Sequence, residues 1–431
     1  MQLNETNPKS RFTRGALRHR NYRLFFVGQG LSLVGTWMQR IAVSWLVYRL
    51  TGSAFLLGFV GFAGQIPTFI FGSFAGVFID RSSRYRILLI TQILATVQSA
   101  LLAFLTLTGH VAVWHIFLLS LSLGVINAFD MPARQSFVVD MVEGREDLPN
   151  AIALTSMVVN GARLAGPALA GLAVAAFGEG VCFLLNALSF VTIIVALLAM
   201  KIKQVERKPS TAHPWHDLKE GYRYAFGFAP IRYLLLLLGL MSIMGMPFQV
   251  LMPVFAKDVL HGGAHTLGFL MGTLGVGALV AAGYLVSRKS VLGLGRVTVA
   301  MCLLFGLGLI GFSLSHQIIL SYIAIFFAGS GMMGALTSCN TIIQTVVDDE
   351  KRGRVMGFHA MAIMGMAPFG SLMAGSLASH IGAPNTVVLG GISCIAASLL
   401  FARKLPAFRK AVHPVYVARK IIAVDKISGP L

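Results

Sequence analysis

The chain has 431 residues, of which 56% are hydrophobic and only 12% are charged. Because an ordinary soluble domain has about 25% charged residues, this composition excludes a soluble globular protein and indicates a protein embedded in a membrane. The formal net charge of +19 would fit nucleic-acid binding, but the positions of the basic residues argue against that function. The 46 glycines exceed the usual ~7%, as expected where membrane helices pack through small residues.

Apolar segments follow one another along almost the whole chain. A helix needs about 20 predominantly apolar residues to cross a bilayer, and we identify twelve segments of roughly that length. They are 24–48, 56–79, 87–107, 113–136, 151–177, 181–200, 233–254, 267–286, 297–314, 318–346, 355–379 and 385–401. We therefore predict an all-α, polytopic membrane protein with twelve transmembrane helices.

The basic residues lie almost entirely on one side of these spans. Segment 1–23, the connections after even-numbered spans and the basic tail 402–431 contain most of them, and we place Arg134 in one of these connections. The other side has only Arg49 and Lys257. By the positive-inside rule both termini are cytoplasmic. The basic charge therefore reports topology, and we expect the lipid bilayer, not nucleic acid, as the partner.

The longest polar connection, 201–232, divides six spans from six. Its second half contains HDLKEGYRYAFGF, which predicts an amphipathic helix at the membrane surface. We expect two pseudo-symmetric six-helix bundles, 24–200 and 233–401. In support, GVFIDR at 76–81 and GYLVSR at 283–288 end the second and eighth spans with the same spacing. Repeats around a central site are the architecture of many secondary transporters.

No pattern in the sequence indicates a cofactor, a metal site or an enzyme. The four cysteines all fall in predicted spans and none forms a CxxC pair, so they are interpreted as core residues. The GxGxxG at 306–311 lies within a span with no strand before it, which favours helix packing. Walker A, HExxH and GxSxG motifs are absent. We therefore expect no enzymatic activity, cofactor or bound metal.

The loop after the second span carries a more specific pattern. Gly76 and the glycine one turn before it leave one helix face bare, so a neighbouring backbone can approach. Asp80, Arg81 and Arg84 follow at the membrane edge, where a carboxylate can pair with arginines. Two interpretations remain open: an ion pair that breaks and re-forms, or a positive-inside anchor with an incidental aspartate.

Three charged side chains lie within predicted spans, where an ionisable residue is expected to face a cavity or a partner. At 1.5 Å per residue, Arg40, Arg163 and Asp130 lie about 24, 18 and 9 Å from the cytoplasmic ends of their spans. Only Asp130 readily releases a proton, since arginine stays charged, so we predict that Asp130 couples transport to protons. Arg163 and Asp130 are close enough in depth to pair, which would leave Arg40 without an acidic partner.

The remaining positive charge favours an anionic or electron-rich substrate. Trp37 and Gln39 lie near Arg40 in the sequence, and Asn127 lies one turn from Asp130, so these residues would supply stacking and hydrogen bonds in a cavity. We predict that Arg40, Arg163, Trp37, Gln39 and Asn127 bind the substrate. The alternative is a structural Arg–Asp pair that ties helices together, with Arg40 reaching the outer interface.

The fifth span contains NGARLAGPALAG at 160–171, an apolar stretch interrupted by Arg163 and by the pair Gly166-Pro167. Its small residues make a bare face for close packing, comprising Gly161, Ala165, Gly166, Ala170 and Gly171. Pro167 removes one backbone donor, which a polar cavity or a neighbouring helix can compensate.

Several of these motifs resemble the major facilitator superfamily. GxxxDRxxR at 76–84 is similar to its cytoplasmic loop signature. RNYRLFFVGQGLSLVGTWMQ (20–39), MPARQSFVVDMV (131–142), LPNAIALTS (148–156) and RGRVMG (352–357) resemble the bacterial efflux branch that includes the enterobactin exporter and macrolide efflux pumps. Gly166, Pro167 and Gly171 resemble an antiporter signature, although Ala162 stands where that signature has glycine.

The resemblance implies alternating access between two bundles, with Gly76, Asp80, Arg81 and Arg84 as a cytoplasmic latch. Ser287 replaces the acid in the second half, so no equivalent latch is expected there. The resemblance further implies a secondary exporter of the bacterial inner membrane, which we expect to be a monomer. The exporter would move a small amphiphilic or anionic molecule outward in exchange for protons, and a siderophore is the first candidate. The alternatives are a multidrug or macrolide-type efflux pump and a membrane sensor that does not transport.

Overall fold

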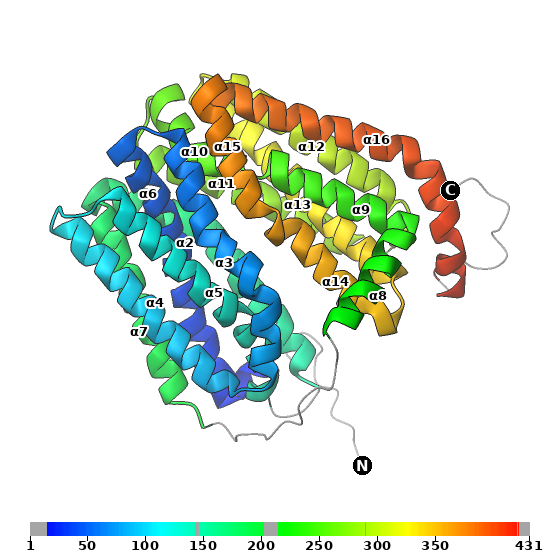
Figure 1. The fold of residues 1–431 in the computed structure, drawn as a ribbon, viewed down its shortest axis with the longest axis horizontal. Helices are drawn as coiled ribbons and strands as arrows, with labels where there is room; N and C mark the ends of the chain where they lie inside the picture. Colours follow the sequence, from blue (N-terminus) through cyan, green and yellow to red (C-terminus); the bar gives the residue numbers. More distant parts are fainter. Residues whose placement is uncertain (1–14, 143–145, 202–213, 289, 420, 422–431) are drawn as a thin grey trace, which may run out of the picture. The chain divides into compact units, whose positions relative to one another are not determined.

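The computed structural model describes residues 15–142, 146–201, 214–288, 290–419 and 421. These residues form helices and connections without any strand (Figure 1), which confirms the all-α prediction. The α-helices are α2 (Arg20–Thr51), α3 (Ala54–Asp80), α4 (Arg84–Leu107), α5 (Val113–Met141), α6 (Leu148–Phe177), α7 (Glu179–Leu198), α8 (Pro214–Gly227), α9 (Ala229–Leu240), α10 (Phe248–Val254), α11 (Ala264–Ser287), α12 (Leu294–Leu314), α13 (Ile318–Val346), α14 (Arg352–Ala360), α15 (Ala367–Ile381) and α16 (Ala383–Ala418).

Shorter helical segments join some of these elements. The 3-10 helices η1 (Ala16–Arg18) and η4 (Asp349–Lys351) precede α2 and α14. The π-helices η2 (Met241–Gly245) and η3 (Phe255–Val259) extend α9 and α10 into one continuous run, and η5 (Met361–Gly365) joins α14 to α15. Within the described residues, the seventh and eleventh predicted spans are therefore helices with π-helical insertions, which are frequent at functional sites.

Eleven helical segments of the described chain are long and apolar enough to cross a membrane. The first predicted span corresponds to α2, which has 32 residues but is too polar to meet the same criterion, since it carries Arg40 and the buried Gln29 and Gln39. The chain is thus a multi-pass membrane protein, and a helix covers each of the twelve predicted spans.

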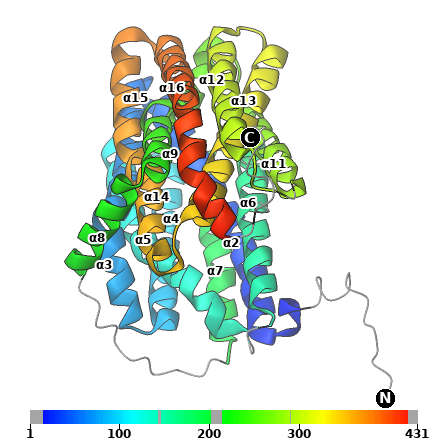
Figure 2. The same ribbon diagram turned by 90° about the vertical axis from the view of Figure 1, so that its right-hand side faces the viewer.

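Two helices continue well past the predicted ends of their spans. α5 reaches Met141, so Arg134 lies inside this helix and not in the predicted connection. α16 continues to Ala418 although Pro406 and Pro414 lie within it, and Figure 2 shows it as one long helix. The first part of the tail 402–431 is therefore helical. The predicted amphipathic helix in 201–232 is present as α8.

The structure divides into two compact units. Unit 1 comprises residues 1–52, 63–210 and 262–272, and unit 2 comprises 53–62, 211–261 and 273–431. In unit 1, α7 packs against α2 and α4, and α6 packs against α2. In unit 2, α12 packs between α13 and α16. The first turns of α3 belong to unit 2 and those of α11 to unit 1.

Glycine pairs lie where the first turns of α3 and of α11 pack against a neighbouring helix. In unit 1, a Cβ added to Gly171 of α6 would lie 2.7 Å from the Cα of Gly268 in α11. In unit 2, a Cβ added to Gly58 of α3 would lie 2.8 Å from the Cα of Gly375 in α15. Because such distances exclude any side chain, both contacts depend on bare backbone, as expected where helices approach closely in a membrane.

Polar side chains hold the interior of unit 1 together. The Gln39 amide donates to Gln98 Oε1 over 3.0 Å, while Ser99 and Asn186 each donate to Gln39 Oε1 over 2.8 Å. All four residues are buried, and each hydrogen bond joins two of the helices α2, α4 and α7. Satisfied networks of this kind fix the register between helices in a membrane.

Asp147 ties the start of the chain to α6. Its carboxylate lies 2.9 Å from His19 Nε2 and 2.7 Å from Arg18 Nη2. The hydrogen bond from His19, followed by the charge of Arg18, holds the pKa of Asp147 below its ordinary value of 3.8. A lowered pKa means that this stabilisation is present at neutral pH and is lost as the pH falls below that value.

Asp147→Asn is therefore expected to lower the unfolding temperature at pH 7, and the difference from the wild type is expected to disappear as the pH falls below 3.8. The check is thermal unfolding of both proteins in detergent across this pH range. Glu146→Gln, at the exposed neighbouring residue, is the control. A difference that stays constant with pH would contradict the assignment.

Candidate functional site

The Trp37 ring contacts two arginines within unit 1. The guanidinium carbons of Arg40 and Arg163 each lie 5.2 Å from the centroid of the Trp37 ring. Arg40 comes from the same helix as Trp37, and Arg163 comes from α6, which packs beside α2 (Figure 1). Trp37 is half-buried, whereas both arginines are exposed at the protein surface. Each arginine makes a cation–π contact, the interaction for which tryptophan is the best aromatic partner.

Arg40 and Arg163 have no anionic partner within the described structure. Among the described residues no carboxylate forms an ion pair with Arg40 or Arg163. Two like charges against one ring, in a segment that spans the membrane, are costly unless an anion or water solvates them. The arrangement therefore has the charge and the flat apolar surface to bind an anionic ligand that carries an apolar or aromatic part.

Gly166 positions this group. A Cβ added to Gly166 would lie 2.4 Å from Trp37 Cβ and 3.1 Å from the Val34 carbonyl oxygen. The bare backbone lets α6 approach α2 at Trp37, and Arg163 stands one turn earlier on α6. Gly171 and the buried Pro167 continue this packing toward α11. The sequence predicted close packing along the whole stretch, but no described atom lies within 4 Å of a Cβ added to Gly161, so this glycine takes no part in the packing that the structure describes.

Gly166→Ala is expected to reduce both thermal stability and transport, because the added methyl group would displace Trp37 or separate the two helices. Overpacking of this kind costs about 1–3 kcal/mol. Gly161→Ala makes the same substitution on the same helix in open space and is expected to leave both properties unchanged. Unfolding temperature and transport rate are the measurements, and an equal loss in the two variants would contradict this role of Gly166.

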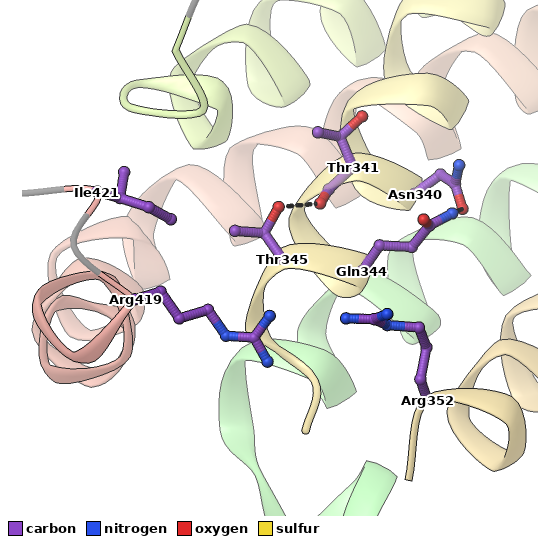
Figure 3. Close-up of a pocket in the computed structure, with 7 residues that line it drawn as sticks. All are labelled: Asn340, Thr341, Gln344, Thr345, Arg352, Arg419 and Ile421. Carbon is purple, nitrogen blue, oxygen red and sulfur yellow. Dashed lines mark hydrogen bonds between the residues drawn. The ribbon is translucent and has the colours of Figure 1, made fainter. Parts of the chain in front are cut away.

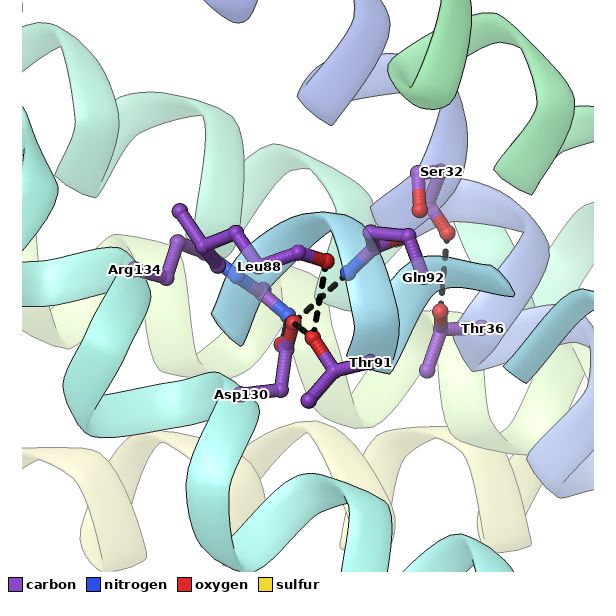
Figure 4. Close-up of polar contacts among 7 residues, drawn as sticks. All are labelled: Ser32, Thr36, Leu88, Thr91, Gln92, Asp130 and Arg134. Atoms are coloured by element: carbon purple, nitrogen blue, oxygen red, sulfur yellow. Dashed lines mark hydrogen bonds and ion pairs between the residues drawn. The ribbon is translucent and has the colours of Figure 1, made fainter. Parts of the chain in front are cut away.

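A second polar cluster surrounds Asp130 (Figure 4). The Asp130 carboxylate is 2% exposed. It accepts hydrogen bonds from Thr91 Oγ1 over 3.0 Å and from Gln92 Nε2 over 2.6 Å, both on α4. It also forms an ion pair with Arg134, one turn further along α5. Three donors thus point at one buried carboxylate and satisfy its hydrogen-bonding capacity.

This geometry corrects the expected pairing of Asp130 with Arg163. Asp130 is paired with Arg134, and Arg163 lies over Trp37. The sequence signal was present in the i,i+4 spacing of Asp130 and Arg134, which brings opposite charges together on one helix. Because Arg134 was expected in a connection and not in the helix, the pairing was not predicted. Thr91 and Gln92 were not predicted, since apolar periodicity does not show which polar residues of a neighbouring helix face an acid.

Gln39 and Asn127 differ from the other predicted substrate-binding residues. Gln39 is 2% exposed and is fully engaged in the network between helices, so its side chain does not share the exposed surface of Arg40. Asn127 is half-buried, one turn before Asp130 on α5. Of the predicted set, the structure therefore brings together Trp37, Arg40 and Arg163.

The residues of the predicted latch lie at the end of α3 and the start of α4. The side chain of Asp80 is outside the described part of the structure. Arg81 is exposed, while Arg84 donates to the Ser136 carbonyl oxygen over 2.7 Å and lies 3.5 Å from the Asp140 carboxylate of α5. The expected close approach at Gly76 is not seen, because no described atom lies within 4 Å of an added Cβ.

The chain is similar in sequence to known transport proteins. The chain is 26% identical over 380 residues to the staphyloferrin A transporter of Staphylococcus aureus, which covers 88% of this chain and 95% of that protein. It is 24% identical over 404 residues to macrolide efflux protein A of Streptococcus pyogenes, covering 88% and 96% of the two chains.

Solved structures show the same fold. A bacterial homologue of the human lysosomal transporter Spinster superposes with a TM-score of 0.66 at 12% identity, covering 95% of this chain and 99% of that one. The POT family transporter PepTSo gives a TM-score of 0.68 at 13% identity, covering 91% of this chain and 99% of that one.

Residues 12–430 match the family model for transmembrane secretion effectors. The chain belongs to this family, a branch of the major facilitator superfamily of membrane transporters.

Proposed function

We propose that the protein is a secondary active exporter of a small anionic molecule, with both termini in the cytoplasm of a bacterium and the spans in its inner membrane. The observation that carries this proposal is that Arg40 and Arg163 both contact the Trp37 ring and have no carboxylate partner among the described residues. An anion that binds both guanidinium groups relieves their mutual repulsion, and its apolar part stacks on the indole ring. Transport of this anion would require no chemical conversion of the substrate.

We further propose that Asp130 couples export to proton entry. A proton on Asp130 would neutralise its carboxylate and break the ion pair with Arg134. The Arg134 guanidinium would then be free to bind another acceptor. Because Asp130 joins α5 to α4 through Thr91 and Gln92, its protonation would weaken the packing of these helices. Proton binding is thereby linked to a change in helix arrangement, which is the requirement for antiport.

A siderophore is the first candidate for the substrate. The similarity to a staphyloferrin A transporter supports this choice. The two arginines at Trp37 also favour an anionic substrate. The experiment is to measure siderophore in the medium of a deletion strain under iron limitation. A fall in secretion that the wild-type gene restores is the expected result, and unchanged secretion would exclude this substrate.

The second candidate is efflux of macrolides or other hydrophobic drugs, which the similarity to macrolide efflux protein A favours. Such substrates need little anionic character, so they would not depend on two unpaired arginines. Drug susceptibility of the deletion strain distinguishes the two candidates. A transporter-like sensor is a third possibility, and accumulation of labelled substrate in inverted vesicles would exclude it.

A further inference from the structure

Unit 2 contains a polar cavity where α13 ends, α14 begins and α16 comes to its end (Figure 3). Its volume is about 480 Å³. Six polar residues line it: Asn340, Thr341, Gln344, Thr345, Arg352 and Arg419. Figure 3 shows the guanidinium groups of Arg352 and Arg419 directed toward each other across this space. We call this cavity the Arg352–Arg419 pocket.

The hydrogen-bonding groups of the pocket favour an anion. Arg419 donates one bond to the Val347 carbonyl oxygen over 2.5 Å, and Arg352 pairs with Asp349, which lies outside the lining and is 78% exposed. Each guanidinium has five N–H donors, so several remain. Gln344 Nε2 donates to Asn340 Oδ1 over 3.0 Å, an orientation that leaves the Asn340 amide as a further donor. Within the described part of the chain, no acidic residue lines the pocket.

A smaller cavity adjoins the pocket. Its volume is about 120 Å³, and Thr341 lines both cavities. Three of its six lining residues are apolar: Leu285, Val291 and Leu294. Arg288, Ser290 and Thr341 complete the lining, and Arg288 donates hydrogen bonds to Tyr284 Oη and the Leu292 carbonyl oxygen. An anion-binding space beside an apolar slot, at the end of membrane helices, matches the two parts of a phospholipid.

We propose that the Arg352–Arg419 pocket binds a phosphate group, separately from the transported substrate. Two guanidinium groups facing one space match the several oxygens of a phosphate. Under the proposed topology this end of unit 2 lies at the cytoplasmic surface, where anionic lipid headgroups bind basic pockets between transmembrane helices. The phosphate is that of an anionic lipid or of a soluble phosphate compound, and the adjoining apolar slot favours the lipid.

The test is a thermal-shift titration of the purified full-length protein in neutral detergent at constant ionic strength. Short-chain phosphatidylglycerol is expected to raise the unfolding temperature, and short-chain phosphatidylcholine is not. Arg419→Gln and Arg352→Gln are each expected to weaken phosphatidylglycerol binding about tenfold, the loss expected for charged hydrogen bonds. Arg403→Gln, at an exposed position of α16 outside the pocket, is the matched control and keeps full affinity.

Two further measurements identify the source of the phosphate and control for variants that fail to fold. A shift with inorganic phosphate that is equally sensitive to Arg419→Gln would assign the pocket to soluble phosphates. Asn340→Leu removes an amide donor without touching the Val347 contact and is expected to weaken binding as well. The proposal is overturned if neither phosphatidylglycerol nor phosphate shifts the wild type, or if Arg403→Gln weakens binding as much as Arg419→Gln. None of these readouts depends on transport activity.

Discussion

Replacing Asp130 by Asn is expected to abolish transport driven by a pH gradient, because the asparagine amide cannot carry the proton. Thr91 and Gln92 still have an oxygen to which they can donate. Exchange of substrate across the membrane without a gradient is expected to continue. The measurement is uptake of labelled substrate into inverted vesicles, with and without an acidic interior. Full gradient-driven accumulation in this variant would contradict the role of Asp130.

A control separates loss of coupling from loss of stability. Asp130→Asn leaves the half-buried Arg134 without its carboxylate, and breaking a fully buried ion pair in this way costs about 3–5 kcal/mol, which is an upper bound here. The double variant Asp130→Asn with Arg134→Gln removes both charges and is expected to unfold at a higher temperature than the single variant. It is still expected to lack gradient-driven transport. Recovery of transport in the double variant would show that the aspartate is structural.

Charge changes at Arg40 and Arg163 have the second large expected effect. Either arginine replaced by Gln is expected to raise the KM for an anionic substrate about 10- to 100-fold, the loss expected when hydrogen bonds to a charged group are removed. Arg40→Glu is expected to abolish transport of the anion, since it places a carboxylate beside the binding surface. The measurement is the initial transport rate against substrate concentration.

The matched control for these variants is Arg20→Gln, at an exposed position at the start of the same helix. It removes one positive charge far along α2 from Trp37 and is expected to leave KM unchanged. Trp37→Leu is expected to raise KM while leaving the two charges in place, because stacking is lost. Equal effects of Arg20→Gln and Arg40→Gln would show that the protein responds only to net charge.

The helices could be predicted well from the sequence because a bilayer demands a fixed apolar length. Each of the twelve predicted spans is covered by a helix, and the start of most helices falls within a few residues of its expected position. The ends of α5 and α16 were missed for one reason. Both helices continue into polar sequence past the apolar segment, where hydropathy no longer marks the boundary.

The candidate site was harder to predict, because helical rise gives the depth of a residue but not its direction. Depth favoured the pairing of Asp130 with Arg163, and nearness to Arg40 in the sequence grouped Gln39 with Trp37. In the structure Asp130 is paired with Arg134 on its own helix, and Gln39 is directed into the packing with α4 and α7. The contact of Trp37 with Arg163 depends on the close approach at Gly166, which no single-helix pattern reveals.

The most direct test of the account is the accumulation of a labelled anionic siderophore in inverted vesicles with an acidic interior. We predict that wild-type protein accumulates the siderophore, that a protonophore stops this accumulation, and that the paired variant Arg40→Gln with Arg163→Gln reduces it to background while Arg20→Gln does not. Accumulation by the paired variant at the wild-type rate would contradict the assignment of Trp37, Arg40 and Arg163 as the anion-binding site.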